Sequence, residues 1–84
     1  MFTVYVLYSK DYQKIYIGYT SDLEKRLLSH NKLGTKGWTV RFRPWTLAYT
    51  ETLTTKQEAL IRERQLKSAR GRKFIWERIE KSPQ

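Results

Sequence analysis

The stretch that decides the fold is KIYIGYTSDLEKRLLSH, residues 14–30. Its first half alternates with the period of two that is typical of a β-strand, and this places Tyr16 and Gly18 on the same face. Its second half opens with Ser21 and Glu24, the capping-box spacing that begins a helix. The stretch therefore predicts a strand followed by a helix that runs to about its end.

Two polar residues of that predicted helix, Arg26 and His30, are four positions apart and so lie on one face of it. Each has an ordinary explanation when taken alone. Arg26 can pair with Asp22 on the surface, a contact worth well under ~1 kcal/mol, and a histidine can cap a helix end. Together with Tyr16 they form a set of polar groups that a strand and a helix do not need for building a core.

The segment Phe2–Tyr8 alternates as well, and the four polar residues SKDY after it predict a hairpin loop. With that loop Tyr8 pairs with Gln13, and Tyr5 lies opposite Tyr16. The core face of the hairpin is expected to carry Val4, Val6, Ile15 and Ile17. The opposite face carries Tyr5, Tyr16 and Gly18, where the missing side chain leaves room for a helix, a ligand or solvent to approach.

The rest of the chain adds a third strand and two helices. They are expected in this order: a long loop over 31–45, a strand from Thr46, a helix capped by Thr54 or Thr55 that runs to about Ser68, a break at Gly71, and a short helix over Lys73–Glu80. The order β-β-α-β-α-α predicts an α+β fold, a small three-stranded antiparallel sheet flanked by helices. We expect one domain over residues 1–80 and a frayed tail over 81–84.

The charge is strongly basic and unevenly placed. Seventeen Lys and Arg against eight Asp and Glu give +9 over 84 residues. Residues 31–46 carry +4 of this and residues 62–81 carry +5, so the rest is neutral. A concentration of this kind is typical of a protein that binds a polyanion, although charge that only maintains solubility is the alternative. The residues expected to contact nucleic acid are Lys32, Lys36, Arg41, Arg43, Arg62, Lys67, Arg70, Arg72 and Lys73.

Glu63 stands out on the predicted helix before Ser68. Helical periodicity places it on the inward side, between Ala59, Leu60 and Leu66. A carboxylate there costs several kcal/mol unless it is paired or binds a cation. A pair with Lys67 is one explanation, and a metal ligand is the explanation we favour.

These residues together resemble the GIY-YIG endonuclease domain over almost the whole chain. The second triplet is intact as Tyr16-Ile17-Gly18, whereas the first appears as Thr3-Val4-Tyr5 and keeps only the tyrosine. Arg26 and His30 follow at family-like spacing, and EALIRERQLK resembles the helix that carries the glutamate of the family, here Glu63. By length, the chain is similar to small stand-alone bacterial members. Several family nucleases carry an asparagine beyond the glutamate, a position that this chain leaves without one.

The resemblance implies a hydrolase: an endonuclease that uses Mg²⁺ or Mn²⁺ to cleave phosphodiester bonds, with DNA the favoured substrate. It implies catalytic roles for Tyr5 as general base, Tyr16, Arg26, His30 and Glu63, with Glu63 as the metal ligand. The alternatives are a nucleic-acid-binding module of the same fold that does not cleave, and a sheet whose tyrosines stack single-stranded bases.

The setting expected from sequence is a reducing cytoplasm. The chain has no cysteine for a disulfide, and no apolar run near the ~20 residues of a membrane helix. No membrane is expected, a protein partner is left open, and DNA is not distinguished from RNA.

Overall fold

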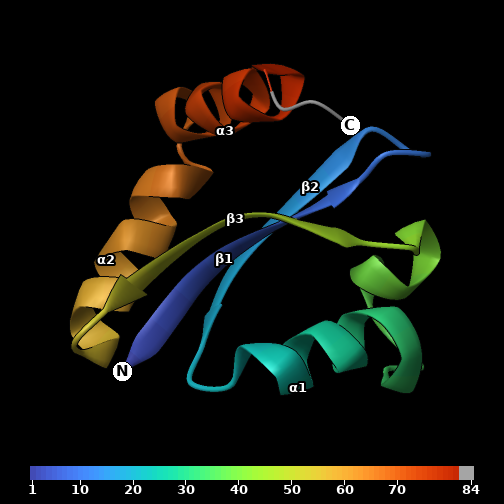
Figure 1. The fold of residues 1–84 in the computed structure, drawn as a ribbon, viewed down its shortest axis with the longest axis horizontal. Coiled ribbons are helices and arrows are strands. Elements are labelled where there is room, and N and C mark those ends of the chain that lie inside the picture. The colour runs from blue at the N-terminus through green and yellow to red at the C-terminus, as the bar shows by residue number, and fades with distance from the viewer. Residues whose placement is uncertain (82–84) are drawn as a thin grey trace.

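Figure 1 shows the computed structural model, which describes residues 1–81. Three strands and three α-helices follow in the expected order β-β-α-β-α-α, with two short helical turns between α1 and β3. The elements are β1 Phe2–Ser9, β2 Lys14–Thr20, α1 Leu23–Leu28, η1 Ser29–Leu33, η2 Trp38–Phe42, β3 Thr46–Leu53, α2 Lys56–Lys67 and α3 Ala69–Lys81. The predicted α+β class is confirmed. Most of the predicted frayed tail, residues 82–84, lies outside the described residues.

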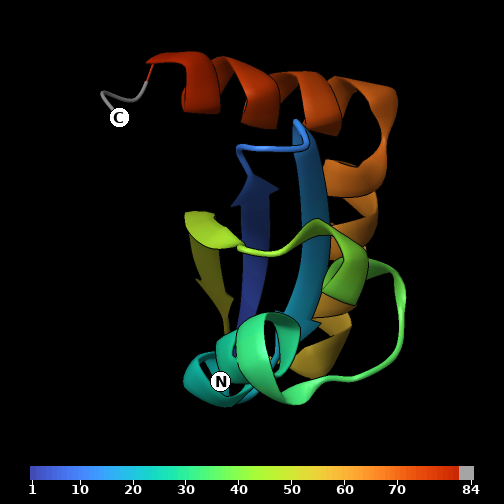
Figure 2. The ribbon, with the colours of Figure 1, turned by 90° about the vertical axis from the view of Figure 1, so that its right-hand side faces the viewer.

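The antiparallel sheet has the order β2-β1-β3, so β1 is central and β2 is an edge strand. Figure 2 shows helices on both sides of it. On one face Val4, Val6 and Ile17 pack against Leu66 and Ile75 of α2 and α3. On the other face Tyr5, Leu7 and Trp45 pack against residues of α1 and η2. Because both faces are covered, β1 is buried over most of its length.

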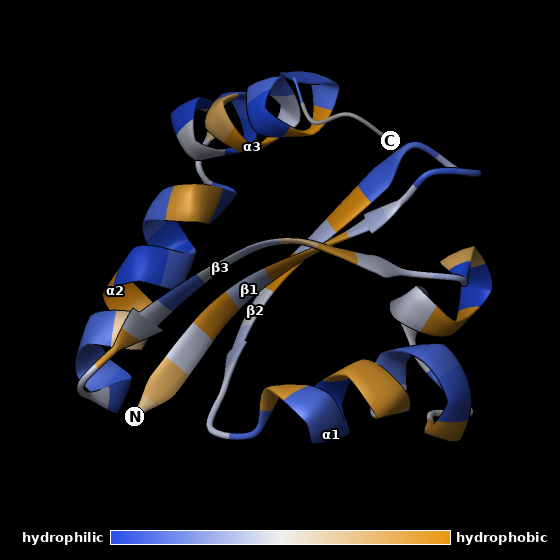
Figure 3. Cartoon of the chain, viewed as in Figure 1, coloured by the Kyte–Doolittle hydropathy of each residue, from blue (hydrophilic) through white to orange (hydrophobic). Residues whose placement is uncertain are grey.

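The α2 and α3 helices are largely hydrophilic, as the colours of Figure 3 show. Their buried residues are the few that face the sheet: Ala59, Leu66, Ile75 and Ile79. Leu60, which was expected to face inward, is instead 37% exposed. The inward stripe of α2 therefore passes from Ala59 through half-buried Glu63 to Leu66.

The predicted pairing of the hairpin is wrong by two residues. Tyr8 pairs with Ile15 rather than Gln13, and Tyr5 lies opposite Gly18 rather than Tyr16. The turn begins one residue later than expected, because Gln13 adopts a left-handed φ of 53° and its side-chain amide donates to the Lys10 carbonyl at 2.8 Å. A shift of two residues preserves the faces, so Tyr5 and Tyr16 still share one, as diagonal neighbours.

The start of α1 also differs from the expectation. Asp22, not Ser21, is the N-cap residue, and its side chain accepts a hydrogen bond from the Lys25 amide at 3.2 Å. Thr20 holds Asp22 in place, because its hydroxyl accepts from the Asp22 amide at 3.0 Å. The predicted loop over 31–45 is partly helical, since it includes the end of η1 and all of η2.

The α2 helix begins as predicted, with a capping box between Thr55 and Glu58. Its last residue is Lys67 and its C-cap is Ser68, which agrees with the predicted end. The break lies at Ser68 rather than at Gly71, because Ser68 has an extended ψ of 165° and its hydroxyl accepts from the Gly71 amide. Ser68 thereby starts α3, which is longer than predicted. Gly71 is needed for close approach: a Cβ there would lie 2.5 Å from the Leu66 Cα and 2.6 Å from the Leu66 carbonyl oxygen. None of the helices within residues 1–81 is long and apolar enough to span a membrane.

This contact predicts an unusual response to Gly71→Ala. In an ordinary exposed helix the change stabilises by about 1 kcal/mol. Here the new methyl group meets α2 backbone that cannot rotate away, so we expect a loss of about 1–3 kcal/mol in urea unfolding. Lys73→Ala, at an exposed position of the same helix, is the control and should be nearly neutral. A stabilised Gly71→Ala protein would contradict this packing of α2 on α3.

Candidate active site

A hollow of about 470 Å³ lies across the free edge of β2, between α1 and α2. Tyr16 and Gly18 of β2, Arg26 of α1 and Glu63 of α2 line it. A guanidinium and a carboxylate from helices on opposite faces of the sheet can share this hollow, because residues 1–81 place no further strand beside β2. The hollow thus brings together three of the predicted catalytic residues, Tyr16, Arg26 and Glu63, with Gly18. Tyr5 joins them through its contact with Gly18.

Tyr5 of β1 is the cross-strand partner of Gly18 of β2, and its phenol covers the glycine. A Cβ at Gly18 would lie 2.7 Å from the Tyr5 hydroxyl oxygen and 3.2 Å from the Tyr16 ring. The room left by the glycine is therefore occupied by the Tyr5 phenol rather than by a ligand or solvent. Tyr5 is fully buried, and its ring centroid is 6.3 Å from that of Tyr16.

The Tyr5 hydroxyl is connected to His30 and then to Thr39. The Tyr5 oxygen is 3.0 Å from His30 Nε2, and His30 Nδ1 is 3.0 Å from the Thr39 hydroxyl. The Arg26 guanidinium approaches the same Tyr5 oxygen, and a guanidinium can only donate. We therefore assign the Tyr5 proton to the contact with His30 Nε2, and the His30 proton to Nδ1, which then donates to Thr39.

The pKa of Tyr5 is raised and the pKa of His30 is lowered, and each shift favours the uncharged form of its side chain. Burial raises the pKa of Tyr5, although the nearby Arg26 guanidinium partly offsets this. Burial and the positive charges of Arg26 and Arg43 lower the pKa of His30. At neutral pH the structure thus holds a neutral phenol as donor and a neutral imidazole as acceptor.

The backbone around His30 leaves the α-helical pattern. Ser29–Leu33 form a π-helical turn, closed by a 2.8 Å hydrogen bond from the Gly34 amide to the Ser29 carbonyl. Arg43 clamps this turn, donating to the carbonyls of Ser29, His30 and Gly34. Single π-helical turns are rare and often occur at functional sites. Here the turn directs the His30 ring toward Tyr5.

Asn31, the only asparagine of the sequence, is not among the residues that line the hollow. Its side-chain oxygen accepts from the Trp45 amide at 2.7 Å, and its nitrogen donates to the Trp45 carbonyl at 3.0 Å. Asn31 therefore connects η1 to the start of β3, away from the hollow.

Glu63 makes the pair with Lys67 that was one explanation of its sequence position, and its role as a metal ligand stays a prediction. Its carboxylate is 3.4 Å from Lys67 Nζ, and its side chain is only 18% exposed. It also lines the hollow opposite Arg26. Residues 1–81 contain no cluster of three or more His, Cys, Asp or Glu side chains. A single carboxylate fits Mg²⁺ or Mn²⁺, which keep several waters and complete their coordination with substrate phosphate oxygens.

The nine basic residues expected to contact nucleic acid fall into two groups. Three are engaged within the protein: Arg43 by the carbonyls of η1, Arg62 by Glu51 at 3.0 Å, and Lys67 by Glu63. The other six are exposed, and the described part of the chain pairs none of them with a carboxylate: Lys32, Lys36, Arg41, Arg70, Arg72 and Lys73. To bind a phosphate, Arg43 and Arg62 would have to give up these contacts within the protein. We therefore leave both out of the proposed phosphate-binding set.

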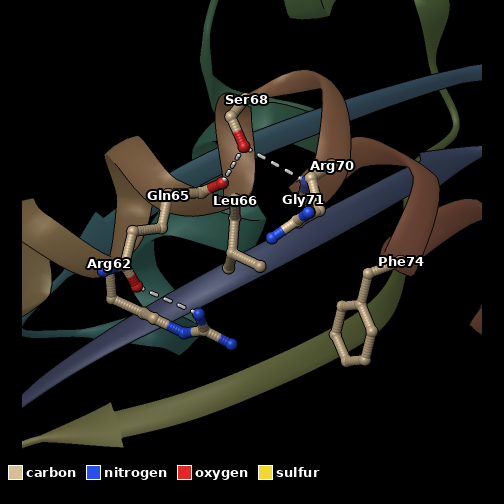
Figure 4. Close-up of a pocket in the computed structure, with 7 residues that line it drawn as sticks. All are labelled: Arg62, Gln65, Leu66, Ser68, Arg70, Gly71 and Phe74. Carbon is tan, nitrogen blue, oxygen red and sulfur yellow. Dashed lines mark hydrogen bonds between the residues drawn. The ribbon is translucent and has the colours of Figure 1, made fainter.

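A second hollow, of about 540 Å³, lies at the elbow between α2 and α3. Figure 4 shows Leu66 and Phe74 beside it, with Arg62 and Arg70 nearby. It is mostly apolar, and none of the five predicted catalytic residues lines it. The larger hollow is thus a gap between two helices rather than a site with converging reactive groups.

Comparison with known proteins identifies a family and several relatives. The GIY-YIG catalytic domain family matches residues 1–75. The chain is 40% identical over 65 residues to a UPF0213 protein of Staphylococcus saprophyticus, covering 77% of this chain and 78% of the relative. It is 39% identical over 69 residues to one of Bacillus velezensis (82% and 69% covered) and 37% identical over 67 residues to one of Halobacterium salinarum (80% and 86% covered). No solved structure matches the chain significantly.

The chain therefore belongs to the GIY-YIG family, and the predicted resemblance is confirmed. Membership implies a nuclease-type function with nucleic acid as the substrate. Nucleases of this family generally depend on a divalent metal, whereas the names of the UPF0213 relatives state no activity.

The sequence did not predict the support of His30. It missed Thr39, Gly34 and the contacts that Arg43 makes with the backbone carbonyls. These contacts depend on a π-helical turn, which no pattern in the sequence predicted. One signal was present: Gly34 stands just after a helix that ends in a lone histidine.

The lowered pKa of His30 predicts how stability depends on pH. An unfolded histidine has a pKa near 6.5, so below that value the unfolded chain binds a proton that the folded chain resists. The stabilising contribution is complete above about pH 6.5 and is lost as the pH falls through the lower folded pKa. We expect the wild-type unfolding free energy to fall on acidification from about pH 6.5.

His30→Gln is the comparison, since His30 is the only histidine. The variant should be less stable at neutral pH but should show a flatter dependence between about pH 5 and 7 in urea unfolding. An identical slope in both proteins would show that His30 titrates normally, contrary to its buried contact with Tyr5.

Proposed function

We propose that the chain is a divalent-metal-dependent endonuclease that hydrolyses phosphodiester bonds, with DNA as the favoured substrate. The observation that carries this proposal is the hollow across β2, where Arg26 and Glu63 face each other beside Tyr16. Phosphodiester hydrolysis requires a group that grips the phosphate, a group that holds a cation and a group that accepts a proton. The hollow and the Tyr5–His30 couple beneath it offer one candidate for each.

Arg26 would bind the scissile phosphate through its planar guanidinium. In the free protein this guanidinium approaches the buried Tyr5 hydroxyl. When Arg26 turns to the phosphate, the hydroxyl beneath Gly18 would face the hollow. Catalytic contacts of this kind often form only in the substrate complex.

Tyr5 would then act as general base through His30. The attacking water would add to phosphorus and give a proton to the Tyr5 oxygen, while Tyr5 passes its own proton to His30 Nε2. The bond from phosphorus to the leaving sugar oxygen would break, and that oxygen would take a proton from solvent. Tyr16, at the wall of the hollow, would position the water or the phosphate.

Glu63 would hold one Mg²⁺ or Mn²⁺ ion, releasing Lys67 from its 3.4 Å contact. When bound, the ion would neutralise charge on the phosphoryl oxygens and assist the leaving oxygen. Lys67 is exposed and could then contact a neighbouring phosphate.

The exposed basic residues would follow the nucleic acid backbone on either side of the hollow. Lys32, Lys36 and Arg41 belong to the segment between α1 and β3, and Arg70, Arg72 and Lys73 belong to α3. Contacts of this kind hold the backbone without reading sequence and weaken as salt rises.

The test is cleavage of a panel of duplex, single-stranded, flapped and branched substrates with and without Mn²⁺, combined with Glu63→Gln. We expect the variant to lose metal-dependent cleavage while still binding nucleic acid. In chelator its melting temperature should equal or exceed that of the wild type, because the pair between half-buried Glu63 and exposed Lys67 contributes at most about 1 kcal/mol. Millimolar Mn²⁺ should stabilise the wild type against heat and leave Glu63→Gln unaffected.

Glu77→Gln, which changes an exposed glutamate of α3, is the matched control and should behave as wild type in each assay. Equal stabilisation of wild type and Glu63→Gln by Mn²⁺ would move the metal away from Glu63. Tight nucleic acid binding by the wild type with no cleavage of any substrate would favour the alternative, a binding module of the same fold.

A further inference from the structure

A row of aromatic side chains, exposed at both of its ends and half-buried at its middle, starts at the wall of the hollow. Trp38 is 44% exposed and Tyr12 is 50% exposed, and Phe42 lies between them. The ring centroids of Trp38 and Phe42 are 4.8 Å apart, and those of Phe42 and Tyr12 are 5.3 Å apart. We call Trp38, Phe42 and Tyr12 the aromatic row.

The row is continuous with the site. The Tyr16 ring, which lines the hollow, stacks on Trp38 with a centroid distance of 6.4 Å and an interplanar angle of 30°. One side of Trp38 packs on Tyr16 and on the buried Trp45, whose centroid is 5.8 Å away. Packing on Trp45 explains only the side of Trp38 that faces the core. Phe42 is half-buried against the same cluster as Trp45. The exposed parts of Trp38 and Tyr12 have no such explanation, and large exposed apolar groups that lie close together mark interaction sites.

Two free cations stand over the same row. Lys14 Nζ lies 5.4 Å from the Phe42 ring centroid, and the Arg41 guanidinium lies 5.8 Å from it. Both side chains are exposed, and the described residues pair neither with a carboxylate. Aromatic faces with adjacent cations are the chemistry that binds unpaired bases and their phosphates. A continuous duplex keeps its base faces stacked inside and cannot use it.

We propose that the aromatic row is a subsite that stacks an unpaired base next to the scissile phosphate, so that the chain prefers single-stranded segments to continuous duplex. Lys14 and Arg41 hold the phosphate that follows. Because Trp38 stacks on Tyr16, the base that the row takes belongs to a nucleotide adjoining the hollow. The inference rests on the proposed function and names the substrate class of the same hollow.

The test measures binding without cleavage, by fluorescence anisotropy in chelator in a Glu63→Gln background. The probes are a labelled oligonucleotide of about ten nucleotides and its duplex. We expect the single strand to bind more tightly, and Trp38→Leu to weaken single-strand binding about tenfold while leaving duplex binding nearly unchanged. Leucine keeps an apolar cover over Trp45, and Trp38→Phe, which keeps a ring, should restore most of the affinity.

Two further variants make the test specific. Tyr12→Ala, in the exposed hairpin turn, should also reduce single-strand binding without unfolding the protein. Phe74→Ala is the matched control: Phe74 is 40% exposed and has Arg78 5.6 Å from its ring, but it lies on α3, which packs on the opposite face of the sheet. A fluorescent adenine analogue in the oligonucleotide should be quenched by stacking in the parent and Phe74→Ala proteins and not in Trp38→Leu.

The outcomes separate this inference from the proposed function. Equal losses for single strand and duplex in Trp38→Leu, or a loss as large in Phe74→Ala, would overturn the subsite and leave the nuclease proposal standing. A single-strand preference that depends on Trp38, in a protein that cleaves nothing, would support the subsite and overturn the nuclease proposal.

Discussion

The contact between the Tyr5 phenol and Gly18 is the constraint on which the site depends. Any other residue at position 18 would force the Tyr5 phenol to move, because a Cβ would lie 2.7 Å from the Tyr5 hydroxyl oxygen and 2.9 Å from the ring carbon that bears it. The glycine therefore lets the Tyr5 phenol pack directly against the backbone of β2. That position sets where His30 Nε2 must lie, and the π-helical turn with its Arg43 clamp holds the imidazole there.

The position of β2 at the sheet edge has a second consequence. A helix on each face can reach around an edge strand, but not around a central one such as β1. Arg26 of α1 and Glu63 of α2 consequently meet at one hollow, although they belong to layers that the sheet separates. A sheet of three strands thus presents one hollow to helices from both of its faces, in a domain whose described residues form two small core clusters.

Much of the fold could be predicted from the sequence because period-two strands and helix caps are local. The bounds of β3 and the capping box of α2 came directly from such patterns. The errors have non-local or stereochemical causes. The hairpin register depends on the left-handed φ of Gln13, and the elbow at Ser68 depends on how closely Gly71 can approach Leu66. The residues at the site were found by resemblance, whereas their supports were not, since Thr39 and Arg43 act through contacts that only the folded loop creates.

A neutral His30 that accepts a hydrogen bond from a neutral Tyr5 is the central feature of the proposed site, and nitrogen NMR of the His30 imidazole is its most direct test. We expect a proton on Nδ1, none on Nε2, and a titration midpoint below about 6.5. Tyr5→Phe should remove the preference for that tautomer. A proton on Nε2 in the wild type, or a midpoint at or above about 6.5, would contradict the Tyr5–His30 couple and the proton path built on it.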